Sequence, residues 1–305
     1  MRTRVIQICA LSALSLAALS ARADKSVEER LAADPHGSVE INNVAGSVDL
    51  QGWDKPQVEV TGTAGSDVDR VSVTGDAAHV SVQVITRQNR LWGSDGSAHL
   101  LVHVPAKSAV SVTLVSADFS VGGLLGDLKL QSVSGEVKGE VGGDLRAGSV
   151  SGNIHLNARA AKSLVVKTVS GDITLAGGSG ETDLTSVSGT IKVEEGTQTR
   201  AHFKSVSGDI TAKLAMSADA QIDGQSVSGD IKLNFASNPV ADFDVQSISG
   251  DIENCFGPKP VQPRHGPGSR LAFKNGESNA RVQISTKSGD VSLCTEHAQP
   301  AKPSA

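Results

Sequence analysis

A six-residue motif recurs along the chain and constrains its fold more than any other sequence feature. The clearest copy is Ser-Val-Ser-Gly-Asp-Ile at 226–231. A fixed period near 20 residues is typical of stacked repeat architectures. The copies follow one another at intervals of 17 to 21 residues, and the last interval of 39 corresponds to about two periods. The glycines of the motif stand at 135, 152, 171, 189, 208, 229, 250 and 289.

Apolar and polar residues alternate on both sides of each motif. Counted from the first Ser or Thr as position 0, positions −4 and −2 are mostly apolar, and so are positions +5 and +7, as in Ile231 and Leu233. Period-two alternation indicates strands with one buried face. Because the inward phase shifts by one residue between the two strands, we expect a bend or bulge at Ser-Gly. Glycine would supply a backbone angle there that other residues resist.

Each repeat is therefore predicted to form a strand, a corner and a second strand, followed by a variable turn. One repeat cannot bury its apolar face alone, whereas parallel stacking of repeats buries a continuous core. The sequence predicts an all-β protein, a parallel β-solenoid with about 18–21 residues per coil over 116–294. Residues 24–115 carry longer alternating runs, which we expect to form an N-terminal β region that begins or caps the stack.

The first 23 residues have the pattern of a secretory signal peptide. A basic start is followed by an apolar run from Val5 to Leu19, and Ala21 and Ala23 fit the cleavage site. The run is too short to cross a bilayer, which needs about 20 apolar residues. We therefore expect an exported protein, in the periplasm or at the cell surface, with no transmembrane segment in the mature chain. Loss of residues 1–23 removes three arginines and takes the net charge from −5 to −8, which disfavours a nucleic-acid partner.

Two cysteines remain beyond the signal peptide. Cys255 and Cys294 each stand eight residues after position 0 of their motif. If the segment between them loops out, their coils are neighbours at strand spacing, within reach of a disulfide. Because export favours oxidation, we predict this disulfide. A metal site is not expected, because no further ligands stand at a suitable spacing.

The segment 256–270 between these coils is rich in proline and glycine. It carries Lys259, Arg264 and Arg270, a basic patch on an acidic protein. We favour a solvated loop tied at its base by the disulfide. The alternative is a docking loop for an envelope-stress or regulatory partner. Residues 295–305 are expected to be disordered.

Position +1 of the motif is aliphatic in all copies but the last, where Lys287 replaces it. Strict alternation points these side chains outward, and an exposed apolar stripe of this kind usually marks a contact surface. A turn of the corner could instead direct them inward, and we favour that interpretation. The aliphatic residues at +1 are Val133, Val150, Val169, Val187, Val206, Val227 and Ile248.

Position +4 is acidic in most copies, including Asp209, Asp230 and Asp251. Stacked carboxylates could bind calcium or supply an acid/base pair, as in β-helical enzymes that act on polysaccharides. We favour solvated or turn-capping carboxylates, because a group repeated in successive coils indicates architecture rather than catalysis. The sequence contains no nucleophile elbow, HExxH motif or phosphate-binding loop. We therefore expect neither catalytic residues nor a cofactor.

Four features resemble the bacterial β-strand-repeat family called "putative adhesin", a domain of unknown function. They are Asn43-Val-Ala-Gly-Ser-Val48, Gly52-Trp-Asp54, the serial motifs and the closing Ser288-Gly-Asp-Val-Ser-Leu-Cys294. The resemblance implies an exported envelope or surface protein and carries no catalytic residues. We expect a non-enzymatic, adhesin-like or structural protein that presents a repetitive β surface to a protein or polysaccharide partner. A polysaccharide-acting β-helix enzyme is the remaining alternative.

Overall fold

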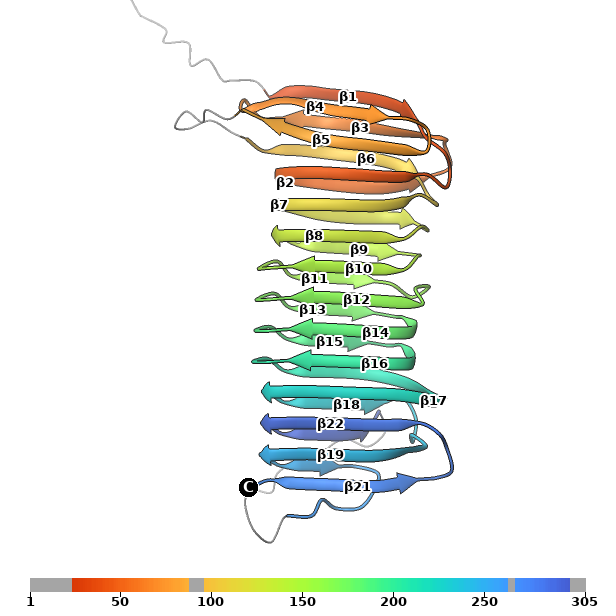
Figure 1. Cartoon of the computed structure of the whole chain (residues 1–305), viewed down its shortest axis with the longest axis vertical. Coiled ribbons are helices and arrows are strands. Elements are labelled where there is room, and N and C mark those ends of the chain that lie inside the picture. Colours follow the sequence, from red (N-terminus) through yellow and green to blue (C-terminus); the bar gives the residue numbers. More distant parts are fainter. Residues whose placement is uncertain (1–23, 88–95, 263–266, 297–305) are drawn as a thin grey trace, which may run out of the picture.

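The computed structural model describes residues 24–87, 96–262 and 267–296. Within these ranges, 23 strands form one hydrogen-bonded sheet that winds into a tall, narrow stack (Figure 1). The described residues contain no helix, and most strand pairs in the stack are parallel. The predicted all-β class and solenoid architecture are confirmed.

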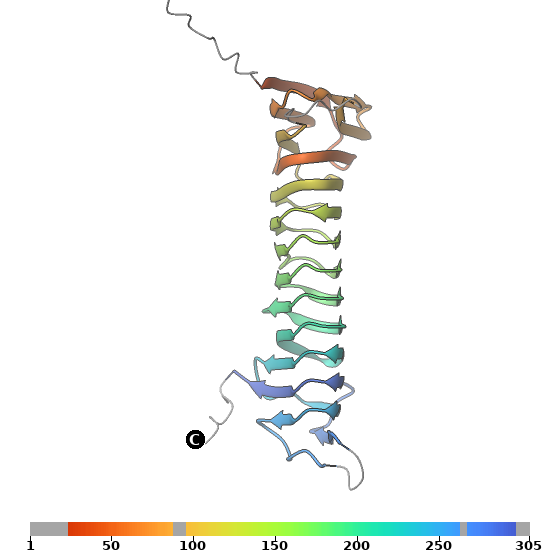
Figure 2. The ribbon, with the colours of Figure 1, turned by 90° about the vertical axis from the view of Figure 1, so that its left-hand side faces the viewer.

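Each coil of the central stack consists of two strands joined at the corner motif. In one coil these strands are β8 (Leu128–Ser134) and β9 (Val137–Val141), and in the next they are β10 (Leu145–Ser149) and β11 (Ile154–Asn157). β8 pairs with β10, and β9 pairs with β11, in parallel. Two sheets therefore face each other across the core, and the molecule is thin when viewed from the side (Figure 2).

The same arrangement continues toward the C-terminal end of the stack. The core consists of columns of apolar side chains, one from each coil, and position +5 of the motif forms a fully buried column. β17 is the longest strand, because it runs from the second sheet of one coil into the first sheet of the next. The strands here are β12 (Ser163–Thr168), β13 (Ile173–Ala176), β14 (Ser179–Ser186), β15 (Ile191–Glu194), β16 (Thr197–Ser205), β17 (Ile210–Ser228) and β18 (Ile231–Phe235).

At the N-terminal end, the coil that comes first in sequence is not the outermost coil of the stack. A coil formed by later residues lies outside it. β2 (Ser38–Trp53) and β7 (Ala109–Leu124) each bend through a whole coil and pair with each other in parallel. On its other side β2 pairs with β5 and β6, which form the outer coil. The remaining strands here are β1 (Lys25–Ala32), β3 (Gln57–Ala64), β4 (Val68–Gly75), β5 (His79–Thr86) and β6 (Ala98–Pro105).

The C-terminal end repeats this topology. β22 pairs in parallel with both β17 and β19, and β23 pairs with both β18 and β20. The last coil along the chain therefore lies between two coils that precede it in sequence (Figure 1). The strands are β19 (Ala241–Ser249), β20 (Ile252–Asn254), β21 (Ser269–Asn275), β22 (Arg281–Ser288) and β23 (Val291–Thr295).

Antiparallel strands lie outside the outermost coils. β4 covers β5, and β3 with β1 covers β6, at one end, while β21 covers β19 at the other. Covering the ends of a long sheet hinders uncontrolled pairing with other chains. The boundary expected between 24–115 and 116–294 has no counterpart in the sheet, because β7 runs straight through it.

The segment 256–270 begins and ends as part of the end cap. Phe256 is half-buried. The centre of its ring lies 5.6 Å from the ring centre of Phe243 and 6.2 Å from that of Phe273. Ser269 and Arg270 already belong to β21. Phe256 and Ser269 therefore depart from the expected solvated loop, whereas residues 257–259, 261 and 262 are exposed. No helix in the described residues is long and apolar enough to span a membrane.

Candidate functional site

The corner motif forms one long edge of the stack, where β8, β10 and β12 end on the left of Figure 1; Figure 2 faces this edge. The side chain at position 0 points inward at this edge. Thr168 Oγ1 donates to the carbonyl oxygen of Gly171 at 2.8 Å, and the amide of Gly152 donates to Ser149 Oγ at the same distance. These buried hydroxyl groups tie the bend of the corner to the strand before it.

The aliphatic side chain at position +1 points outward. Val133 to Ile248 at this position are 41–50% exposed, so the favoured inward interpretation is wrong. The reason is that the parallel ladder continues through the corner. The amide of Val169 donates to Ser149 O at 3.2 Å, and that of Ser170 donates to Val150 O at 2.8 Å. The backbone stays extended here, and strict alternation places position +1 opposite the buried position 0.

These side chains form a straight row that we call the valine edge. Strand register places Val115 of β7 level with Val133, so the exposed row begins one coil before the first recognised motif, while Val44 of β2, level with Val115, is half-buried. Seven valines follow one another without interruption, at a strand spacing of about 4.8 Å. Lys287 then lies between Val227 and Ile248, because β22 is inserted there. The valine edge consists of Val115, Val133, Val150, Val169, Val187, Val206, Val227 and Ile248.

Sequence periodicity alone missed two corners. In the register of β2, β7 and β8, Asn43 lies level with Leu114, and Leu114 with Ser132. Asn43 and Leu114 stand where the other copies have Ser or Thr, so a search for the motif does not find these two copies. The signal that could have found the second copy is the acidic and apolar pair Asp118 and Phe119 at positions +4 and +5.

The corner glycines are required by the close approach of neighbouring coils. A Cβ on Gly208 would lie 2.3 Å from the carbonyl oxygen of Gly189, and one on Gly229 would lie 2.4 Å from that of Gly208. Among the eight motif glycines, which all lie in the described residues, only Gly135 has a positive φ, of 116°. The expected special backbone angle is therefore wrong for the others. Carbonyl oxygens of one coil occupy the space that a side chain on the next would need.

The carboxylates at position +4 cap the following coil. Asp209 Oδ1 accepts a hydrogen bond from the amide of Asp230 at 2.9 Å, and Asp230 Oδ1 accepts one from Asp290 at 2.9 Å. Asp290 Oδ1 in turn accepts from the amide of Asp251 at 2.8 Å. Within the described residues, no group of three or more His, Cys, Asp or Glu side chains could hold a metal ion. The geometry gives this column an architectural role.

Two of the three basic residues named in the 256–270 segment lie in the described part of the chain. Lys259 is exposed, and Arg270 on β21 forms an ion pair with Asp244, with Nη2 and Oδ1 3.4 Å apart. Arg264 lies outside the described residues. Gly268 approaches the backbone of Ile248, so the segment ends beside the last aliphatic residue of the edge.

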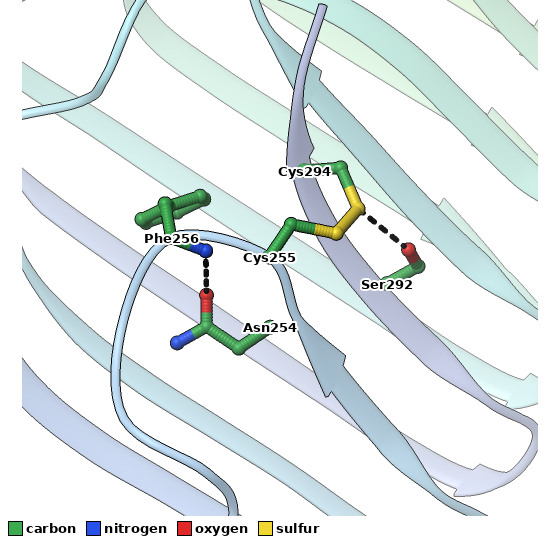
Figure 3. Close-up of a disulfide and its surroundings, with 5 residues drawn as sticks. All are labelled: Asn254, Cys255, Phe256, Ser292 and Cys294. Carbon is green, nitrogen blue, oxygen red and sulfur yellow. Dashed lines mark hydrogen bonds between the residues drawn. A yellow bond between two sulfur atoms is a disulfide. The ribbon is translucent and has the colours of Figure 1, made fainter. Parts of the chain in front are cut away.

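The predicted disulfide joins Cys255 to Cys294, with Cα atoms 4.9 Å apart (Figure 3). It connects β23 of the inserted coil to the residue that follows β20. Cys294 is buried at 2% exposure, and its Sγ lies 3.6 Å from Ser292 Oγ. Phe235, Phe243, Phe256 and Phe273 form an aromatic cluster that closes the core at this end.

Together these features define a two-sheet parallel β-solenoid whose corner motif builds a straight aliphatic edge, interrupted only near its C-terminal end by Lys287. A sequence model of the family described as Toastrack DUF4097 matches residues 36–294, and the chain belongs to this family. A comparison with curated proteins found no match.

Three solved structures that match this chain come from Parabacteroides distasonis and Bacteroides fragilis. A "putative adhesin" from Parabacteroides distasonis is 12% identical, with 88% of this chain and 97% of that chain covered and a TM-score of 0.43. One from Bacteroides fragilis is 11% identical, with coverage of 88% and 96% and a TM-score of 0.42. A "putative lipid binding protein" from Parabacteroides distasonis is 12% identical, with coverage of 88% and 96% and a TM-score of 0.44. No role is transferred from likenesses at this level.

Proposed function

We propose that this chain is an exported, non-enzymatic protein of the cell envelope that holds a partner along the valine edge. The observation that carries the proposal is the outward direction of the aliphatic column, whose members are 41–50% exposed. Large contiguous apolar patches are uncommon on soluble monomers and usually mark contact sites. The signal-peptide pattern of residues 1–23 supports export to the periplasm or the cell surface.

The valine edge is suited to an extended apolar contact. Its seven consecutive valines span on the order of 29 Å at strand spacing. Serine at position +2 runs beside them and is largely exposed, as at Ser188, Ser207 and Ser228. A row of methyl groups flanked by hydroxyl groups offers burial of apolar area together with hydrogen bonds at its rim. None of the large apolar side chains exposed on the described surface is aromatic, so the edge offers no ring on which a sugar would stack. We therefore favour a protein partner.

The acidic column supports the non-enzymatic part of the proposal. Asp209 and Asp230 each use one carboxylate oxygen to accept a hydrogen bond from a backbone amide of the next coil. A catalytic pair would differ from the repeat, whereas these carboxylates do the same work in successive coils. Both ends of the 256–270 segment belong to the end cap, through Phe256 and Ser269, and its described middle part carries no row of apolar side chains. We therefore favour the valine edge over this segment as the docking surface.

Replacement of four valines by threonine tests the proposal. Thr preserves the shape and strand propensity of Val169, Val187, Val206 and Val227 but removes apolar area from the contact. We expect the variant with all four replacements, carrying a fluorescent label, to bind intact cells or isolated envelopes of the source bacterium at least about tenfold more weakly than the labelled parent chain. Circular dichroism should show an unchanged fold, because these side chains bury nothing in the core.

The matched control changes four outward residues of the second sheet in the same coils to serine: Thr174, Lys192, Thr211 and Lys232. This variant should bind as the parent does. Cells treated with protease before binding should lose the parent's binding sites if the partner is a protein, and keep them if it is a polysaccharide. Equal binding by parent and valine variant would sink the proposal, as would turnover of an envelope glycan without binding.

A further inference from the structure

The last coil of the chain fills a slot that earlier coils leave open. After Phe235 of β18 the chain does not enter the neighbouring coil position but continues at Ala241, one position further along. The vacated position is filled by β22 and β23, which follow β19, β20 and β21 in sequence, and Figure 1 shows β22 between β17 and β19. The slot therefore presents strand edges on both sides to a segment that follows it in sequence.

The inserted coil is held on both of its sides by parallel ladders. β22 is in register with β17 from Arg281 to Ser288 and with β19 over the same span. Its corner follows the rules of the stack, because Asp290 accepts from the amide of Asp251 and donates its own amide to Asp230. All of these contacts are between the coil and the slot. None depends on the coil and the slot belonging to the same chain.

The connector into this coil is a short segment on the surface. Residues 276–280 cross the turn that links β18 to β19. Asn275 Nδ2, just before the connector, donates to Pro239 O, and Ser278 Oγ within it donates to Ala218 O, both at 2.6 Å. Gly276 has a φ of 77°, and a cavity of about 790 Å³ lies beneath the connector, with Leu214 and Phe235 among its lining residues. The connector is thus held at a few points rather than packed along its length. Such a connector can serve as a hinge.

We propose that the slot also accepts the last coil of a second copy of this chain, so that two copies exchange residues 281–295. Exchange of an identical element is a low-cost route to association, because each copy makes the same contacts as before. The Cys255–Cys294 disulfide forms only when a coil occupies the slot. In exchanged copies it would join two chains and fix the pair. The valine edge plays no part in this exchange.

Two cysteine variants test the exchange in the full-length chain. In a Cys9→Ser background, Cys255→Ser leaves a coil cysteine, and Cys294→Ser leaves a slot cysteine. The two variants are mixed, unfolded with reductant, refolded together and oxidised. We expect a dimer on a non-reducing gel in which peptide mapping finds Cys255 joined to Cys294. The ratio of dimer to monomer should rise about tenfold for a tenfold rise in concentration.

Each variant refolded alone serves as the control for random thiol pairing, since it can join only identical cysteines. Monomer alone, or only same-residue links, in the mixture at every concentration would overturn the proposal. A second arm uses the chain with both cysteines and removes Glu277 and Ser278, which shortens the connector. The exchanged, thiol-sensitive dimer should then increase at the expense of monomer, and a chain that stays monomeric with its disulfide formed would also contradict the exchange.

Discussion

At the scale of single residues, the corner motif divides its tasks by direction. Position 0 is buried and bonds the corner in some coils, as at Ser149 and Thr168. Position +1 faces outward, and a carboxylate at position +4 caps the next coil. The residue types could be assigned to a corner from the sequence, because alternation and phase are visible in it. The direction of the side chain at position +1, and the reason why glycine is needed at the corner, could not be predicted from the sequence. Both depend on how closely one coil approaches the next.

Replacement of Gly208 by alanine should destabilise the protein by about 3 kcal/mol, because the new Cβ would overlap a backbone oxygen that cannot move without disturbing two coils. Gly148→Ala is the matched control. A Cβ there would meet the amide end of the Gln131 side chain at 2.9 Å, which can rotate away. The control should stay within about 1 kcal/mol of the parent. Urea denaturation followed by far-ultraviolet circular dichroism measures both, and equal losses would contradict the close-approach explanation.

Removal of one capping carboxylate should have a smaller effect. Asp230→Ala leaves the amide of Asp290 without its partner and should cost about 1 kcal/mol of unfolding free energy. Asp230→Asn keeps an acceptor oxygen, as Asn153 does naturally when it accepts from the amide of Asp172 at 3.0 Å. Both variants lose the exposed contact with Lys232, 3.7 Å away, which is worth little. An asparagine variant as unstable as the alanine variant would show that charge, not capping, matters.

At the scale of elements, the strands and their pairing followed from periodicity, and the disulfide followed from the equal positions of its cysteines in two motifs. The structure of the end cap could not be predicted from the sequence. Proline and glycine in 256–270 indicate irregular backbone, which holds as far as β21, but they conceal that Phe256 at the start of the segment and Phe273 beyond its end belong to one aromatic cluster. Aromatic residues far apart in sequence carry no periodic signal, so their meeting at the end of the core became visible only in the structure.

Loss of the disulfide should loosen the C-terminal coils alone. The bond closes a loop of 39 residues, for which chain entropy gives about 4 kcal/mol. In Cys255→Ser/Cys294→Ser, amide hydrogen exchange should become faster in β19, β20, β22 and β23, and remain slow in β10 to β13. Tryptophan fluorescence is a poor reporter, because the two tryptophans, Trp53 and Trp92, belong to the N-terminal part of the sequence.

Addition of reductant to the parent chain is the control for this measurement and should reproduce the exchange pattern of the double variant. Exchange that rises evenly along the whole stack would argue against local loosening. Unchanged exchange in β22 would show that the ladders on its two sides hold the inserted coil without the covalent link.

At the scale of the whole molecule, the order of coils in space differs from their order in sequence at both ends. The sequence predicted that the coils of Cys255 and Cys294 are neighbours, and this is confirmed. It could not show that the last coil also contacts the coil of Val227, because β22 has the same alternation as every other first strand. Identical patterns fit several stacking orders, and only the paths of the connectors at the two ends distinguish them.

The placement of both terminal coils inside the stack has a consequence for how such a protein can change in length. Each end carries its own inserted coil and its own antiparallel cover, while the coils between β8 and β16 contact only their immediate neighbours in sequence. A duplicated unit could therefore enter the middle of the rod without disturbing either end. Each added unit would lengthen it by about 4.8 Å. The reach of the rod, and the number of valines in its edge, would then be adjustable in steps of one coil.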